Sequence, residues 1–180
     1  FDFAERLQVK QLTLQYENIA DELRIPENKS FKFGLAVSNE TPIDLLEKYV
    51  DKLDYILLMT TTPGKSGGKF EKTSFDRIRK CKALYPNVPI YVDGGINAEV
   101  SFILRLLGVS MAVSGSFLVN NQNSAIALAE LRFHQKGSNF LLENFMQTGI
   151  HLPILTHKNC TFMEIVTCME AHKMGFVLFE

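Results

Sequence analysis

Five short apolar runs, separated by amphipathic segments, constrain the fold of this sequence more than any other feature. The runs are centred near Leu14, Ala36, Leu57, Val92 and Val113, about 21 residues apart except for one gap of about 35. Near-continuous apolar character without alternation is typical of parallel strands covered on both faces. Because each run is followed by an amphipathic segment, the pattern predicts strand–helix units and a parallel α/β fold.

The segments between the runs carry signals for helix starts. Thr41 precedes a proline at the first helical position, Thr73 opens a segment with apolar residues every three positions, and Asn97 and Ser124 are candidate caps. The expectation is therefore a helix after each of five strands. The expected strands are residues 12–16, 33–37, 55–59, 89–92 and 111–114.

Two architectures fit this pattern. An eight-stranded barrel usually needs about 200–250 residues, whereas the repeating part of this chain ends near residue 136. The chain is either an open five-stranded sheet or the last five units of a (β/α)8 TIM barrel. The spacing of the runs alone leaves both open.

The tail beyond residue 136 has a different pattern, which predicts two domains, 1–136 and 137–180. Residues 140–146 read as a short helix and residues 153–155 as an extended piece. Thr161 and Glu164 form a capping box ahead of an apolar helical pattern. A last strand is expected at residues 176–179.

Composition excludes several classes of protein. The chain has 180 residues, is 46% hydrophobic and 22% charged, and carries a net charge of -1, so it is globular and offers no overall charge for nucleic acid or an anionic membrane. Its first residues lack the basic start and long apolar stretch expected of a signal peptide, and no apolar run approaches about 18 residues. Three cysteines without a CxxC spacing favour reduced thiols and a cytoplasmic location. Because the first residue is Phe1 rather than Met, we expect the chain to begin within a longer one.

A glycine-rich segment follows the third expected strand. Backbone N–H groups around Gly64, Ser66, Gly67 and Gly68 can converge on a phosphate, and a neighbouring lysine can add charge. The Gly-x4-Gly-Lys-Ser/Thr order of a P-loop is absent. The alternative is a loop whose glycines serve only for turning.

Two further strand ends carry candidate site residues. Asp93 ends the fourth strand and is followed by Gly94 and Gly95, which places a carboxylate beside a helix N-terminus suited to phosphate. The alternative role for Asp93 is a turn former. The fifth strand ends in the small residues Ser114, Gly115 and Ser116. Since the last two loops of a barrel often bind phosphate together, this combination favours the barrel over the open sheet.

These segments resemble the ribulose-phosphate 3-epimerase family. The resemblance covers about residues 3–136 and is carried by residues 34–37, 58–60, 63–70, 92–96 and 113–116, in the family's order and spacing. It implies that the five strands are the fourth to eighth of a (β/α)8 barrel, and that the first three are missing from this sequence.

The resemblance also implies an activity. Such enzymes convert D-ribulose 5-phosphate to D-xylulose 5-phosphate by proton transfer at C3 between two aspartates, through an enediolate stabilised by a divalent metal (Zn, Fe, Mn or Co). Asp93 matches the aspartate of the seventh strand, which is both acid/base and metal ligand. The second aspartate and two histidine ligands belong to the missing strands, so the metal is expected only when those are present.

Further site residues carry over from the same resemblance. Met59 matches a methionine below the sugar, or alternatively serves only in core packing. The expected phosphate cradle consists of Gly67, Gly94, Gly95, Gly115 and Ser116.

Several positions depart from the family pattern. An aromatic residue is replaced by Lys65, a loop glycine by Ser66 and a histidine by Gln15, and residues 38–40 are also atypical. These changes are expected to line the site rather than the core, so they imply a different sugar phosphate, weakened catalysis, or a non-catalytic sugar-phosphate sensor.

The tail resembles the first half of a CBS (cystathionine-β-synthase-type) repeat, on residues 144–149, 152–154, 161–165 and 174–178. Such repeats often bind adenosine nucleotides and dimerise, which implies a regulatory segment and a homo-oligomer. The alternative is a helical extension packed on the barrel.

Overall fold

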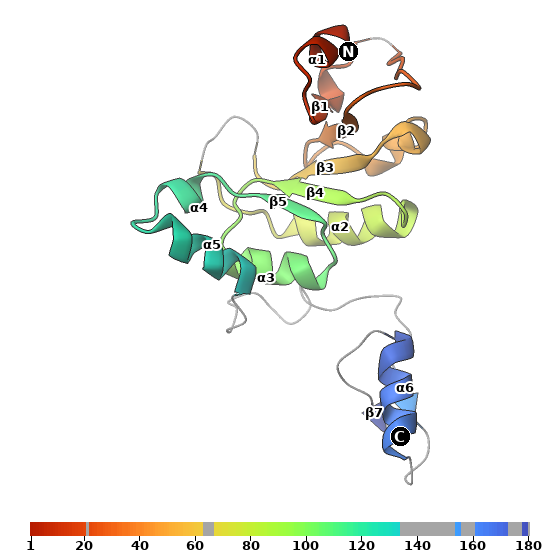
Figure 1. Ribbon diagram of the computed structural model, residues 1–180, viewed down its shortest axis with the longest axis vertical. Helices are drawn as coiled ribbons and strands as arrows, with labels where there is room; N and C mark the ends of the chain where they lie inside the picture. Colours follow the sequence, from red (N-terminus) through yellow and green to blue (C-terminus); the bar gives the residue numbers. More distant parts are fainter. Residues whose placement is uncertain (21, 63–66, 134–153, 156–160, 173–177, 180) are drawn as a thin grey trace. The chain divides into compact units, whose positions relative to one another are not determined.

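The computed structural model describes residues 1–180 except 21, 63–66, 134–153, 156–160, 173–177 and 180. It contains two compact units, Phe1–Met146 and Gln147–Glu180. The first unit holds the parallel sheet, β1 to β5 (Figure 1). No helix among the described residues is long and apolar enough to cross a membrane.

A five-stranded parallel sheet organises the first unit, with its strands in sequence order. Each strand lies within one residue of its expected bounds, so the parallel α/β prediction is confirmed. The order of the strands is also consistent with part of a barrel. The strands are β1 (Gln11–Gln15), β2 (Lys32–Val37), β3 (Tyr55–Met59), β4 (Ile90–Asp93) and β5 (Met111–Val113).

The three helices that follow β3, β4 and β5 were also predicted. They are α2 (Thr73–Leu84), α3 (Ala98–Leu106) and α5 (Ser124–Phe133), the last preceded by the short α4 (Ser116–Val119). Asn97 caps α3, since its Oδ1 accepts from Val100 N at 2.9 Å. The predicted cap of α5 is wrong by one residue: Asn123 Oδ1 accepts from the first turn, while Ser124 Oγ donates to Leu118 O.

The prediction of a helix after each of the first two strands is wrong for the described residues. Only the 3-10 turn η1 (Tyr16–Asn18) follows β1, in a segment interrupted by Pro26. After β2, the chain forms η2 (Ile43–Leu46) and η3 (Val50–Lys52). The buried residues Ile43, Leu46 and Tyr49 repeat every three positions, which matches the three residues per turn of a 3-10 helix rather than the 3.6 of an α-helix.

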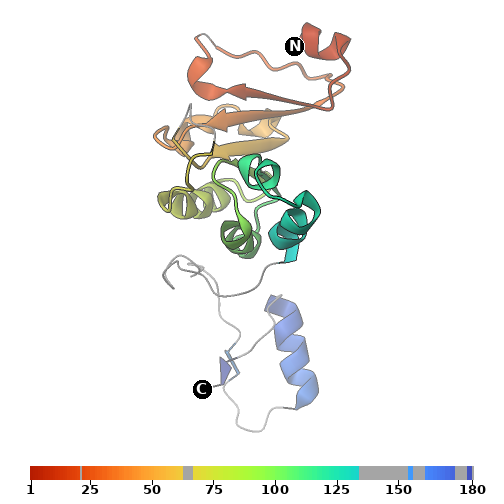
Figure 2. The same ribbon diagram turned by 90° about the vertical axis from the view of Figure 1, so that its left-hand side faces the viewer.

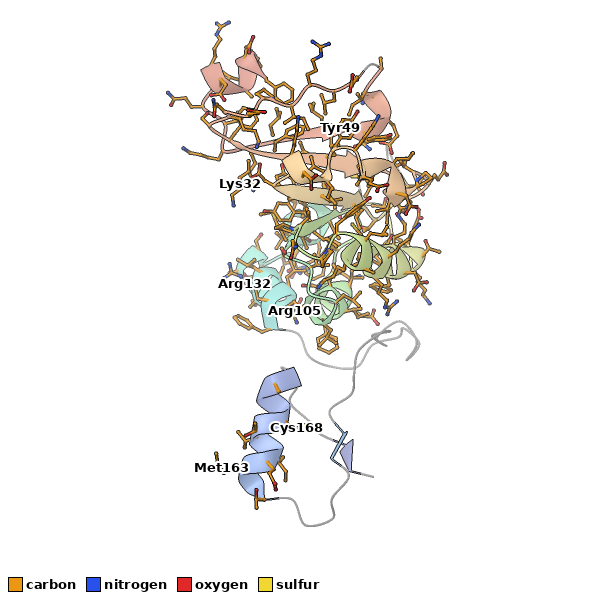
Figure 3. The ribbon with its side chains drawn as sticks, turned by 90° about the vertical axis from the view of Figure 1, so that its right-hand side faces the viewer. Lys32, Tyr49, Arg105, Arg132, Met163 and Cys168 are labelled. Carbon is orange, nitrogen blue, oxygen red and sulfur yellow. The ribbon has the colours of Figure 1, made fainter. Side chains whose placement is uncertain are left out.

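Alternate side chains of the strands build the core on one face of the sheet. Figures 1 and 2 show α2 and α3 along that face, and their apolar residues join those of the strands in one cluster. Ser101 Oγ and Arg105 Nη1 both donate to Leu131 O, which joins α3 to α5. Figure 3 labels Arg105 on α3 and Arg132 on α5. The cluster includes Phe33, Leu35, Val37, Ile56, Leu58, Phe75, Ile78, Ile90, Val92, Val100, Ile103 and Leu104.

The opposite face of the sheet is only partly covered by described residues. Towards β1 it is filled by Tyr55, whose hydroxyl hydrogen-bonds Thr13 Oγ1 at 2.6 Å and whose ring stacks on Tyr91 with centroids 4.3 Å apart. Gly34 provides the room, because a Cβ there would lie 2.3 Å from the Tyr55 ring. Towards β5 the face is open, with Met111 40% and Val113 44% exposed. The expectation of strands covered on both faces therefore holds for only part of this sheet.

The second unit contains β6 (Ile154–Leu155), α6 (Phe162–His172) and β7 (Leu178–Phe179), with the two strands parallel. The predicted capping box is present, since Glu164 N donates to Thr161 Oγ1 at 3.3 Å and Thr161 N donates to Glu164 Oε2 at 2.7 Å. The helix expected at residues 140–146 lies outside the described residues. The likeness to a CBS repeat stays a prediction.

Candidate functional site

The carboxyl ends of β3, β4 and β5 bring three predicted site segments to one edge of the sheet. Met59, Asp93 and Val113 are partners in register across these adjacent strands, so their side chains lie on the same face. It is the face opposite α2 and α3, because the preceding residues Leu58 and Val92 are buried among the helices. The edge therefore exposes a thioether and a carboxylate side by side.

The Asp93 backbone is held firmly, whereas its carboxylate has no hydrogen bond or ion pair among the described residues. The fully buried Thr60 donates from its N to Asp93 O at 2.8 Å. Its Oγ1 lies 3.0 Å from Asp93 O and 2.6 Å from Gly94 O. Burial raises the pKa of Asp93 above its usual 3.8. An unpaired carboxylate with a raised pKa is suited to proton transfer.

The glycine segments meet around a cavity of about 480 Å³. Its described lining contains two lysines and no acidic side chain, and it includes the cap at the N-terminus of α3. Backbone N–H groups at a helix N-terminus and nearby lysines both favour an anion. The lining residues are Gly67, Gly68, Lys69, Phe70, Lys72, Gly95, Ile96, Asn97, Val100, Ser116, Phe117 and Asn120.

The predicted site residues do not all lie in this cavity. Gly67, Gly68, Gly95 and Ser116 line it, whereas Gly64 and Ser66 lie outside the described residues.

Three other predicted residues are near the cavity but are not part of its lining. Gly94 packs against Thr61, whose Cγ2 would be 1.8 Å from a Cβ at that position. Ser114 Oγ donates to Ile96 O at 2.9 Å, which joins the end of β5 to the loop after β4. Gly115 is the residue preceding α4.

Sequence reasoning missed Lys72, Asn120 and Thr60. Lys72 directly precedes α2, and Asn120 follows α4, where neither belongs to a recognised motif. Thr60 lies within residues 58–60, which carry the family resemblance, but its contacts to Asp93 and Gly94 were not predicted.

A second cavity, of about 520 Å³, lies beside η1. Its lining includes Glu17 and Glu22, and its lysine, Lys48, lies 4.7 Å from the centroid of the Tyr49 ring. Two carboxylates make this cavity unsuitable for a phosphate.

Asp93 is also the predicted metal ligand. Among the described residues, no group of three or more His, Cys, Asp or Glu side chains could hold a metal ion. A divalent transition metal in a protein usually has three or four such ligands. The described residues therefore do not make a metal site by themselves.

The comparison with protein families covers all five strands of the sheet. A family model, the ribulose-phosphate 3 epimerase family, matches residues 4–119. The chain thus belongs to an α/β family of isomerase-class enzymes. That family is the ribulose-phosphate 3-epimerases.

Curated relatives carry the same name. The ribulose-phosphate 3-epimerase of Buchnera aphidicola subsp. Baizongia pistaciae is 32% identical over 119 residues, covering 64% of this chain and 52% of that protein. The Bacillus subtilis and Escherichia coli K12 enzymes are 29% and 28% identical, covering 61% and 64% of this chain and 53% of each relative. The chain spans about half the length of the curated relatives it matches.

Among solved structures, thiamine phosphate pyrophosphorylase from Bacteroides thetaiotaomicron aligns with 73% of this chain and 61% of its own, at 15% identity and a TM-score of 0.42.

Proposed function

We propose that this chain supplies the phosphate-binding half and one acid/base carboxylate of a pentulose-5-phosphate 3-epimerase, which interconverts D-ribulose 5-phosphate and D-xylulose 5-phosphate. The observation that carries the proposal is the position of Asp93. Asp93 ends β4 with a carboxylate that has no partner among the described residues, and Gly95, two residues later, lines the lysine-containing cavity. A sugar phosphate anchored in the cavity can extend its carbon chain along the open edge of the sheet.

The proposed chemistry is a proton transfer at C3. Asp93, as the carboxylate, takes the C3 proton while the electron pair of the C–H bond moves into the adjacent ketone, giving an enediolate. A second acid on the other face of C3 returns a proton and inverts the configuration. Met59 supplies an apolar surface beside Asp93, which reduces access of water to the carboxylate.

The described residues do not provide the second acid or a metal site. We propose that the half of the relatives' length that this chain does not span supplies both, together with the strands that cover the open face near Met111 and Val113. The predicted metal then uses Asp93 as one ligand.

A second candidate function is a sugar-phosphate sensor without turnover. The second unit favours it, because a β6–α6–β7 segment following the epimerase-like part is the feature that resembles the regulatory CBS repeat. In this second proposal, the second unit binds an adenosine nucleotide and takes part in forming a homo-oligomer.

The experiment that tests the first proposal is proton–deuterium exchange at C3 of D-ribulose 5-phosphate in D2O, followed by proton NMR, with the full-length protein and added divalent metal. Asp93→Asn should abolish the exchange but retain binding of the sugar phosphate. Asp76→Asn is the matched control, because Asp76 is 85% exposed and its ion pair with Arg79 lies within one helix. Sugar-phosphate binding without exchange in the wild type would reject the epimerase and favour the sensor.

A further inference from the structure

We propose that Glu71 is a positioning residue of the phosphate site, and that Asn39 orients it. This inference rests on the proposed function. Neither residue lines the cavity. They act by fixing the segment Gly67–Phe70, which forms one wall of the cavity.

Glu71 connects the two ends of the glycine-rich segment. Its backbone N donates to Thr60 O at 2.9 Å, and its Oε1 accepts from Thr62 Oγ1 at 2.9 Å. Thr60 and Thr62 precede the segment, whereas Glu71 follows it directly. Glu71 therefore closes the segment at its base through one backbone and one side-chain contact.

The other carboxylate oxygen of Glu71 reaches a neighbouring strand end. Oε2 accepts from Asn39 Nδ2 at 2.7 Å. Asn39 is itself oriented by Ser74, which is 1% exposed and whose Oγ donates to Asn39 Oδ1 at 3.2 Å. Because the amide oxygen is occupied by this donor, the amide nitrogen faces Glu71. The contact thus joins the residues after β2 to those after β3.

The position of Glu71 affects the cavity wall because the packing beside it leaves no room. A Cβ on Gly95 would lie 2.2 Å from Phe70 N and 2.7 Å from Lys69 C, so these backbones are already in contact. A shift of Glu71 would move Phe70 against or away from Gly95, and both line the cavity. Phosphate affinity is therefore expected to depend on the contacts of Glu71.

Two residues that depart from the family pattern take part in these contacts. Ser38 and Asn39 were expected to line the sugar site. In the structure, Ser38 N and Oγ both donate to Glu17 Oε1 at 2.9 Å, and Asn39 donates to Glu71. Both residues therefore join loops at the rim of the sheet.

A charge-swap rescue, which moves the negative charge from position 71 to position 39, tests the proposal. Asn39→Asp keeps the size of the side chain but places a carboxylate against that of Glu71. In the double variant Asn39→Asp/Glu71→Gln, the side-chain amide nitrogen at position 71 donates to the carboxylate at position 39. The amide oxygen at position 71 still accepts from Thr62, and the carboxylate at position 39 still accepts from Ser74. The original contacts are restored with donor and acceptor exchanged. Asn87→Asp, on an exposed turn residue, is the matched control for the added charge.

Two measurements on the full-length protein are required. The first is the hydrogen-exchange rate of the residue-71 amide, which reports the bond to Thr60 without any ligand. The second is the dissociation constant for D-ribulose 5-phosphate and for inorganic phosphate, from NMR titration. Loss of a hydrogen bond to a charged group changes an equilibrium constant by about 10-fold to 100-fold. Asn39→Asp should therefore raise both the exchange rate and the dissociation constant about tenfold. The double variant should return both to within about threefold of the wild type.

The outcomes separate this inference from the proposed function. If the wild type binds phosphate and Asn39→Asp changes neither exchange nor affinity, the positioning role is overturned and the phosphate site stands. A double variant as impaired as Asn39→Asp also overturns it. If the wild type binds neither probe, the phosphate site fails and the inference fails with it.

Discussion

Alanine substitution at Gly95 is the most direct test of how the cavity wall is built. Gly95 has a φ of +67°, in the left-handed region where a residue with a Cβ costs about 1–2 kcal/mol. Its Cβ would also lie 2.2 Å from Phe70 N. Because that neighbour is a backbone atom, it cannot move away by rotating a side chain, and overpacking of this kind costs about 1–3 kcal/mol. The two effects together predict a loss of about 2–5 kcal/mol in the free energy of unfolding.

Two other glycines provide a graded control. Gly67 has a φ of +78°, but the nearest atom to its Cβ position is Ser116 Cβ at 4.0 Å, so only the conformational cost of about 1–2 kcal/mol applies. Gly115 has a φ of -91° and nothing within 4 Å. Its alanine variant should therefore change the stability by less than about 1 kcal/mol.

Urea unfolding followed by far-UV circular dichroism measures these differences. With a slope of about 2 kcal/mol/M, a loss of about 3 kcal/mol moves the midpoint down by about 1.5 M. The expected order of destabilisation is Gly95→Ala, then Gly67→Ala, then Gly115→Ala. Equal midpoints for Gly95→Ala and Gly115→Ala would refute the close approach of Gly95 to Phe70.

Three further predictions concern charges and caps. At Glu17, partial burial raises the pKa, but hydrogen bonds led by that from Thr41 outweigh it and lower the pKa to about 2. Its stabilisation is thus full above pH 4.5 and is lost as the pH falls towards about 2. Glu17→Gln should lower the free energy of unfolding by about 1 kcal/mol at pH 7 after solvent screening, and by less at pH 3. The prediction would be wrong if urea unfolding showed the same loss at both pH values. Burial raises the pKa of Asp93, so the contribution of Asp93 to stability is greatest at low pH and falls as the pH rises through the folded-state pKa. Asp93→Asn should therefore raise the thermal midpoint at pH 7. A lower midpoint would show that the carboxylate has a stabilising partner. Asn97→Ala removes the cap of α3 and should cost about 1 kcal/mol in urea unfolding; an unchanged midpoint would mean that the cap contributes nothing.

The sequence predicts structural elements whose signals lie within a few neighbouring residues. The five strands, α2, α3, α5 and the capping box of α6 were predicted because apolar periodicity and caps act over a few residues. The helix expected after the second strand was wrong: the chain forms 3-10 turns there, and the buried residues Ile43, Leu46 and Tyr49 are spaced three positions apart. After the first strand, the described residues form only the 3-10 turn η1 before Pro26. A three-residue spacing in the sequence does not by itself distinguish the two kinds of helix.

At the candidate site, too, some features follow from the sequence and others only from the tertiary structure. The sequence by itself determined which chemical groups follow each strand: the carboxylate of Asp93, the glycines and the lysines. Only the tertiary structure decided that Gly95 serves a close approach to Phe70 and that the side chain of Asn39 donates to Glu71. The reason is that strand register and loop packing join residues more than 20 positions apart, and those contacts depend on which backbones meet at the edge of the sheet.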